Sequence, residues 1–331
     1  DALRFTLLSM ASPGRDVKLS EERVKGYRNF LNKLRNANNF LKMNKCDFKK
    51  TSKIPKISIN INKWIYAEFI ETKNIVEKNI KDYRFDEAAR NAYKFVWNSY
   101  CDWYLELSKT IFFSSDKKAI KEIREVSSYV FKQILILMHP FIPFVTEEIW
   151  LKNKLDNSKK NFLMLTNWPS GKIKKDVHCK EVEKMIIFIS QIRSFKNELN
   201  VSAGSFVDLS IESTKKGDKL FFLNNDIILK KLGRINHVYD KDQNKPSASL
   251  VVLGGVFKLY FDQSVDLNLI KENLVKKKNK FSYDLKISSQ KLANNSFVEK
   301  APKNIVDKEK TNYTNLKNDI HKIALTIESL E

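Results

Sequence analysis

The stretch GYRNFLNKLRNANNFL, residues 26–41, has the apolar spacing of an amphipathic helix in a helix bundle. At roughly 100° per residue, a second stripe falls away from the apolar arc. The arc holds Tyr27, Phe30, Leu31, Leu34, Ala37 and Leu41, and the second stripe holds Asn29, Lys33, Asn36 and Phe40. No Asp or Glu occurs from Arg23 to Lys45. The stretch therefore predicts a helix with one buried face and one separate polar stripe that has no acid of its own.

The composition of this stripe suits single-stranded RNA. Asn side chains carry both a donor and an acceptor for a base edge, and Lys33 can reach a phosphate or a base acceptor. Phe40 could stack on an unpaired base, and the lack of acids avoids repelling phosphates. The alternative is that Phe40 packs under a neighbouring helix while the amides are only solvated. Periodicity alone leaves these two interpretations equal.

Residues 1–165 read as a helix bundle around this helix. Ser20 is the expected N-cap of the helix from residue 21, and the segment 45–61 reads as a connector. Three further helices are expected over 61–85, 85–113 and 118–138. The prolines of HPFIPFV (139–145) should then break the chain before a short helix opens at TEEIW (146–150). The aromatic residues Trp97, Trp103 and Tyr104 in the third helix are expected in the bundle core.

Residues 166–264 predict a small α+β module. An amphipathic helix over 181–200 is followed by short β-like runs at 206–211 and 236–240. The run SLVVLGGVFKLYF (249–261) predicts a hairpin that turns at Gly254-Gly255.

Residues 265–331 predict an antiparallel coiled-coil hairpin. The apolar residues of its second helix alternate between steps of three and four, with one polar break: Val306, Glu309, Tyr313, Leu316, Ile320, Ile323, Ile327 and Leu330. The first helix has a less regular seam of Leu267, Ile270, Leu274, Phe281 and Leu285, and the turn is expected in NNSFVEKAP (294–302). About 25 residues per helix predict an arm about 40 Å long. Its outer faces carry Lys271, Lys276, Lys277, Lys278, Lys280, Lys286 and Lys291. The predicted fold is thus mainly α, with a small α+β module and a helical arm.

The bulk composition favours a nucleic-acid partner. The 331 residues have a formal net charge of +21, an excess that suits a polyanion. No apolar run approaches the roughly 20 residues of a membrane span, and no secretory signal is recognisable, so the cytoplasm is expected. The cysteines (Cys46, Cys101, Cys179) and histidines (His139, His178, His237, His321) are isolated, so neither a catalytic group nor a metal site is predicted.

Several stretches together resemble the C-terminal part of valyl-tRNA synthetases, which are class I aminoacyl-tRNA synthetases. DALRFTLLSMASPGRDVKLSEERVKGYRNFLNKLRNANNFL (1–41) resembles the start of their anticodon-binding helix bundle, and FVWNSYCDWYLELSK (95–109) resembles its third helix. ILILMHPFIPFVTEEIWL (134–151) is similar to the segment that closes the bundle, and NNSFVEKAPKNIVDKEK (294–310) resembles the tip of the tRNA-binding arm. The matches follow the order of the family and cover nearly the whole chain.

The resemblance implies a piece of a longer enzyme that joins valine to its tRNA with ATP and magnesium. This piece would lack the catalytic and editing domains and would hold no cofactor. It would bind valine tRNA as a monomer and would not bind membranes. The residues carried over for anticodon binding are Lys18, Asn29, Lys33, Asn36 and Phe40, with Phe40 stacking on the loop. The arm would lean on the outer corner of the tRNA, with the lysines from Lys271 to Lys291 near its backbone.

Three alternatives stand beside this interpretation. An isoleucyl or leucyl relative would have a similar bundle, but the C-terminal hairpin argues against both. A non-catalytic RNA-binding or coiled-coil assembly protein could use the same bundle. A lysine-rich scaffold without an RNA role would bind tRNA indifferently and without salt dependence.

Overall fold

The computed structural model describes residues 1–12, 14, 16–48, 54–153, 162–171, 173, 175–214, 216–243, 245–261, 265–294 and 302–330. The chain divides into two compact units, Asp1–Ile186 (unit 1) and Ile187–Glu331 (unit 2). The boundary falls inside the helix α8 (Val177–Glu198), which therefore contributes its first half to unit 1 and its second half to unit 2. The mainly helical fold predicted from the sequence is confirmed. The division at 165/166 and 264/265 stays a prediction.

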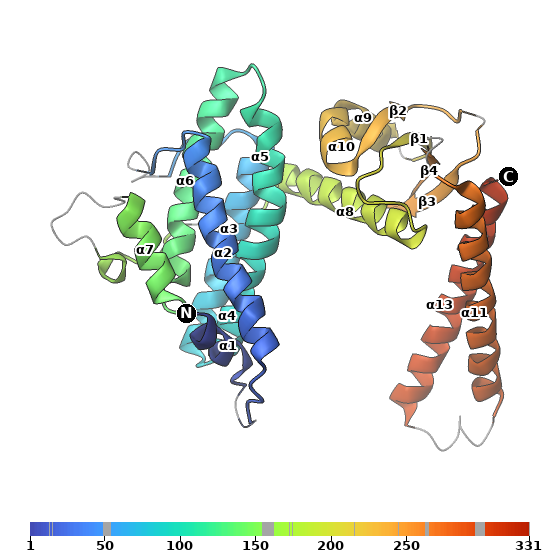
Figure 1. Ribbon diagram of the computed structural model, residues 1–331, viewed down its shortest axis with the longest axis horizontal. Helices are drawn as coiled ribbons and strands as arrows, with labels where there is room; N and C mark the ends of the chain where they lie inside the picture. The colour runs from blue at the N-terminus through green and yellow to red at the C-terminus, as the bar shows by residue number, and fades with distance from the viewer. Residues whose placement is uncertain are drawn as a thin grey trace. The chain divides into compact units, whose positions relative to one another are not determined.

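Unit 1 is a helix bundle, as predicted (Figure 1). The predicted apolar arc of α2 is confirmed, since Phe30, Leu34 and Leu41 are fully buried. The bundle consists of α1 (Ala2–Met10), α2 (Glu21–Met43), α3 (Asn60–Lys81), α4 (Phe85–Lys94), α5 (Leu105–Phe112), α6 (Lys117–Met138) and α7 (Pro143–Asn153). A short 3₁₀ turn, η3 (Leu163–Leu165), follows among the described residues.

The helix α7 begins earlier than the sequence predicts. It starts at Pro143 rather than at Thr146, because a proline lacks only an N–H that the first helical turn leaves unpaired. The Asp1 carboxylate accepts hydrogen bonds from the backbone N–H groups of Phe144 (3.2 Å) and Val145 (2.6 Å). These bonds satisfy two of the free donors at the start of the helix.

The third predicted helix is continuous but changes its winding. Between α4 and α5 lies the π-helical segment η2 (Phe95–Tyr104). A π-helix closes its hydrogen bonds over five residues, so residues five apart can share a face. Phe95 and Tyr100 are accordingly both buried in the core. Because the sequence prediction assumed α-helical winding, it assigned some of the remaining aromatic residues of this segment to the wrong face.

A buried carboxylate ties α4 to the chain that follows α1. Asp86 accepts hydrogen bonds from Arg90 (2.7 Å), Ser12 (3.1 Å) and Arg84 (3.3 Å), and its side chain is 1% exposed. Burial alone would raise the pKa of Asp86, but the hydrogen bonds from Arg84, the Glu87 backbone, Ser12 and Arg90 outweigh it and hold the pKa at about 2.

We expect the ionised Asp86 carboxylate to stabilise unit 1 and this stabilisation to be lost at acidic pH. Because its pKa is lowered from the ordinary 3.8 to about 2, its contribution is complete above pH 3.8 and is lost as the pH falls toward 2. Asp86→Asn should lower the free energy of unfolding near neutral pH by about 1–3 kcal/mol. All five tryptophans lie in unit 1, so tryptophan fluorescence during urea unfolding measures this unit alone.

The difference in the free energy of unfolding between Asp86→Asn and the natural protein should disappear as the pH is lowered toward 2. Asp82→Asn removes an exposed carboxylate nearby and serves as the control. A difference that stays constant through the acid range would show that Asp86 is not charged in the fold.

Unit 2 is built on a four-stranded sheet. It consists of β1 (Val207–Ser213), β2 (Ile235–Tyr239), β3 (Ala248–Val252) and β4 (Gly255–Phe261), in the order β2-β1-β4-β3. β1 pairs with β2 in parallel, and the other two pairs are antiparallel. The parallel pair needs a crossover, which α9 (Lys216–Asn224) and α10 (Asp226–Gly233) provide. The sequence analysis predicted the strands but not these two helices.

The predicted hairpin is confirmed, but its turn lies one residue earlier. Leu253 and Gly254 form the turn, both with positive φ (54° and 73°), and Gly255 is the first residue of β4. Two central residues with positive φ match the twist of antiparallel strands. A side chain on Gly255 would come within 3.1 Å of the Ser213 carbonyl oxygen, which explains the second glycine.

The predicted antiparallel arm is confirmed as α11 (Leu267–Ala293) paired with α13 (Lys303–Ser329) (Figure 1). All the predicted seam residues of both helices are buried or half-buried. The turn predicted over 294–302 lies mostly outside the described residues. The base of the arm shares a core with the rest of unit 2, formed by Leu199, Val201, Ala248, Ile270, Leu274, Ile323 and Leu330. The arm is thus rooted in the sheet and in the end of α8.

No helix within the described ranges is both long enough and apolar enough to cross a bilayer.

Candidate RNA interface on α2 and the arm

The amides of the α2 stripe are exposed as predicted. Asn29 and Asn36 both face solvent, and Lys18 is exposed in the segment that leads into α2. Neither amide of the stripe is used in the packing of the bundle, so their donors and acceptors are open to a partner. Lys33 and Phe40, the other two members of the stripe, are only half-buried and have neighbours within the bundle.

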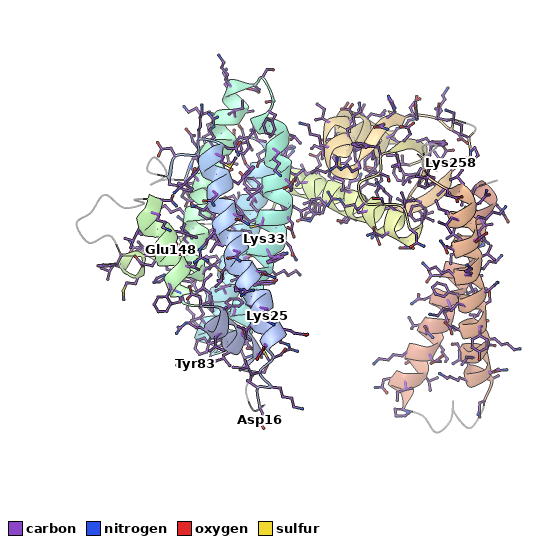
Figure 2. All side chains as sticks on the ribbon, viewed as in Figure 1. Asp16, Lys25, Lys33, Tyr83, Glu148 and Lys258 are labelled. Carbon is purple, nitrogen blue, oxygen red and sulfur yellow. The ribbon has the colours of Figure 1, made fainter. Side chains whose placement is uncertain are left out.

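Lys33 lies against the π-helical segment η2. Its Nζ is 4.0 Å from the centre of the Trp97 ring and forms an ion pair with Asp102. Figure 2 labels Lys33 part-way along α2. The expectation of a stripe without acids therefore needs correction, because an acid from another helix lies beside it. The side chain of Lys33 is held at one position by an aromatic face and a carboxylate.

A series of packed aromatic rings holds the Trp97 ring in place beside Lys33. Trp97 stacks on Tyr93 with ring centres 5.7 Å apart, and Tyr93 packs against Phe30 of α2 at 4.8 Å. The prediction of a buried Trp97 and Trp103 is wrong, since both are half-buried, whereas Tyr104 is fully buried as predicted. The wider turn of η2 moves Trp97 toward the surface, where its face meets Lys33.

Phe40 has a partner on α5 and an open side. Its ring lies edge-to-face with Phe112, with centres 5.9 Å apart, and the Lys109 Nζ is 5.6 Å from its centre. Lys109 also pairs with Glu106 at 2.6 Å. Phe40 is thus neither a free platform nor a core residue. The packing alternative is correct for one edge of the ring, and part of its surface remains exposed.

The lysines of the arm differ in how free they are. Lys277 pairs with Glu198 of α8 (3.4 Å), and Lys291 lies 4.0 Å from Glu309, the polar break in the seam of α13. The exposed members of the predicted set are Lys276, Lys280, Lys286 and Lys291, and the half-buried members are Lys271, Lys277 and Lys278. The outer part of α11 therefore presents separated positive charges to solvent.

Two family models match the chain. The anticodon-binding domain of tRNA ligases matches residues 62–211, and the valyl-tRNA synthetase tRNA-binding arm matches residues 266–331. The valine–tRNA ligase of Pelagibacter ubique is 67% identical over 330 residues, which are 100% of this chain and 38% of that protein. The valine–tRNA ligases of Bartonella quintana and Brucella suis are 36% and 34% identical, over 100% and 99% of this chain and 37% and 36% of their own lengths. The chain belongs to the valyl-tRNA synthetase family. It corresponds to a C-terminal portion and spans less than two-fifths of the relatives' length.

The two family matches differ in which of the candidate RNA-binding residues they contain. The arm match contains both α11 and α13 with all seven predicted lysines. The bundle match begins after α2, so it includes Trp97, Asp102 and Phe112 but none of the five predicted anticodon-binding residues. The sequence analysis placed Trp97 in the core and gave Asp102 no role. Their contact with Lys33 depends on how α2 and η2 pack, for which a single sequence carries no signal.

Proposed function

We propose that this chain supplies tRNA recognition to a valine–tRNA ligase, in which the whole protein joins valine to its tRNA with ATP. The supporting observation is that an anticodon-binding model and a valyl-specific arm model match one chain in this order. We propose that the reaction itself, with ATP and magnesium, is carried out by parts of the whole protein outside this chain. We also propose that the protein acts as a monomer in the cytoplasm, where translation takes place.

The α2 stripe is proposed to read the anticodon. Asn29 and Asn36 offer amide donors and acceptors to base edges, and Lys33 offers a charged donor at a fixed position. Phe40 offers the open part of its ring for stacking, and Lys18 adds a positive charge at the start of α2. The carboxylate of Asp102 keeps phosphates away from this point, which favours a base edge over the backbone.

The arm is proposed to hold the outer corner of the tRNA through its backbone. Lys276, Lys280 and Lys286 project from α11 into solvent. Such contacts fix the position of the RNA without reading its sequence. Lys271, Lys277, Lys278 and Lys291 complete the proposed set, and Lys277 and Lys291 would first release Glu198 and Glu309. We propose that the chain is divided at residues 165 and 264 accordingly. The bundle (1–165) reads the anticodon, the arm (265–331) holds the outer corner, and the α+β module (166–264) lies between them in the sequence.

A filter-binding titration tests the proposed function. It compares valine tRNA, the same tRNA with its middle anticodon base changed, and an unrelated tRNA, at two salt concentrations. A loss of affinity on changing the one base, in addition to a general salt dependence, supports anticodon reading. Equal affinity for all three tRNAs would leave only a basic RNA-holding surface and would favour the non-catalytic RNA-binding alternative.

Asp102→Asn should separate affinity from discrimination. Removing the carboxylate lowers the repulsion of phosphates, so the affinity for every tRNA should rise by about 0.2–1 kcal/mol, or roughly 1.5- to 5-fold. The ratio between valine tRNA and its anticodon-changed form should fall, because Lys33 is no longer held in place. The ion pair is part-exposed, at 26% and 44%, so the stability of unit 1 should change little.

Glu106→Gln is the matched control for this prediction. It removes a neighbouring acid that pairs with Lys109 instead of Lys33. The control should share the small general gain in affinity but keep the discrimination between anticodons. If both variants lose discrimination equally, the position of Lys33 is not what reads the base.

A further inference from the structure

A second basic site lies in unit 2, at the end of α10. An open pocket of about 410 Å³ is lined by Phe206, Lys230, Lys231, Arg234, Ile235 and Asn236. The pocket lies where α10 meets β2, two elements that lie side by side in Figure 1. Three of its six lining residues are cations, and none is an acid. The two family-derived sites, the α2 stripe and the arm, contain none of these residues.

An aromatic ring forms one wall of this pocket. The Arg234 guanidinium lies 5.3 Å from the centre of the Phe206 ring, which is 39% exposed. RNA bases stack both on aromatic rings and on guanidinium planes. Proteins that bind single-stranded RNA combine such a flat stacking surface with several cations, because the bases stack on the surface and the cations attract the phosphates.

Only one of the three pocket cations is neutralised by a carboxylate in the described part of the fold. Lys230 pairs with Asp226 at 2.9 Å, but no carboxylate among the described residues pairs with Lys231 or Arg234. Two further cations lie behind them: Arg193 donates to the Leu232 carbonyl oxygen (2.8 Å), and the buried Lys196 donates to the Ser205 carbonyl oxygen. Burial and the charges of Arg234 and Arg193 lower the pKa of Lys196, so this cluster carries mutual repulsion.

The backbone of Arg234 is also unfavourable for its side chain. Arg234 follows α10 in the left-handed conformation (φ 55°, ψ 52°), where glycine is the usual residue. The preceding residue, Gly233, ends the helix with an ordinary conformation instead. A long cationic side chain at a strained position is a reason to look for a role beyond the fold. The bland explanation is that Lys230, Lys231 and Arg234 stabilise the carbonyl end of α10.

We propose that this pocket binds a single-stranded or distorted segment of the same tRNA, with phosphates near Lys231 and Arg234 and a base on the Phe206–Arg234 platform. The inference rests on the proposed function, because it takes tRNA as the partner. It assigns a third contact to the module between the bundle and the arm. Because this contact is made to the backbone and to the face of a base, it does not depend on the anticodon.

Arg234→Gly is the decisive variant, tested in the intact chain with valine tRNA and its anticodon-changed form. Glycine suits the left-handed position, so thermal stability should stay equal or rise. The affinity for both tRNAs should fall by the same factor, roughly 10- to 150-fold, as expected for a charged hydrogen bond. The slope of log K against log salt should become shallower by about one, the expectation for one lost phosphate contact.

Two further variants complete the test. Phe206→Leu keeps an apolar side chain but removes the ring, so affinity should fall while the salt slope stays unchanged. Lys241→Gln removes an exposed charge of the same unit outside the pocket and should change affinity less than twofold, an effect of net charge alone. If Arg234→Gly binds tRNA as tightly as Lys241→Gln, or loses stability together with affinity, the pocket has only a structural role. Failure of the proposed function would instead show as equal binding of all tRNAs by the unaltered chain.

Discussion

Leu274→Ala should destabilise unit 2 by about 2–5 kcal/mol, the usual cost of emptying a buried leucine site. Leu274 is 5% exposed and belongs to the cluster that joins the arm to Leu199 and Ala248. A cavity of about 530 Å³ beside it is lined by Phe195, Phe281 and other residues. Leu274 therefore has fewer packing contacts to lose than a leucine enclosed on all sides, and the loss is expected toward the lower end of the range.

The two units can be observed separately in this experiment. Every tryptophan is in unit 1, whereas circular dichroism detects the helices and strands of both units. Leu274→Ala should shift part of the circular dichroism transition to lower urea and leave the tryptophan fluorescence transition in place. Leu269→Ala, at a position 52% exposed on the same helix, is the control and should change stability by no more than about 0.5 kcal/mol. Equal shifts in both signals would show that the two units unfold together.

Because the base of the arm shares a core with the rest of unit 2, deleting the whole arm is not a clean test of its role in tRNA binding. Deleting all of 265–331 removes four members of the shared core (Ile270, Leu274, Ile323 and Leu330), so unit 2 should lose stability along with the arm. A shorter deletion from Lys278 to Asp319, closed by a turn, keeps that core and removes Lys278, Lys280, Lys286 and Lys291. Weaker tRNA binding with an unchanged unfolding transition would then assign the loss to the arm itself.

The sequence predicted periodic elements well and their mutual contacts poorly. The seam from Val306 to Leu330 and the buried arc of α2 depend on repeat spacing, which a sequence displays directly. The crossover helices α9 and α10 were missed because each is short, with nine and eight residues, and so shows little helical periodicity. The turn at Leu253-Gly254 lay one residue from its predicted position, because two adjacent glycines leave the choice of turn residues open.

In the candidate site, too, the sequence predicted which face a residue occupies but not which residues of other helices it contacts. Local spacing separated Asn29 and Asn36 from the apolar arc, and both are exposed. It could not show that Lys33 meets Asp102, because these residues are far apart in sequence and meet only through helix packing. The π-helical winding of η2, which sets the faces of Trp97 and Asp102, has no recognisable sequence signal here. The basic pocket around Arg234 is different, since five of its six lining residues lie within residues 230–236 and only Phe206 is brought to them by the fold.

Phe40→Ala should weaken the binding of valine tRNA by about 1–3 kcal/mol, roughly 5- to 150-fold, the usual worth of a base stacked on an aromatic ring. The ring also packs edge-to-face on Phe112, so the variant should lose about 0.5–1.5 kcal/mol of unit 1 stability. Filter binding measures the first effect, and tryptophan fluorescence during urea unfolding measures the second.

Two controls decide between stacking and packing. Phe113→Ala removes a 77% exposed ring at the end of α5 and should leave tRNA affinity unchanged, which excludes a general effect of surface aromatics. Phe112→Leu removes the partner ring but keeps Phe40, so it should lower stability and largely preserve affinity. If Phe112→Leu and Phe40→Ala weaken tRNA binding equally, Phe40 acts by supporting the bundle. If only Phe40→Ala does so, its exposed surface contacts the RNA, because the two variants share the loss of packing and differ only in the ring that faces solvent.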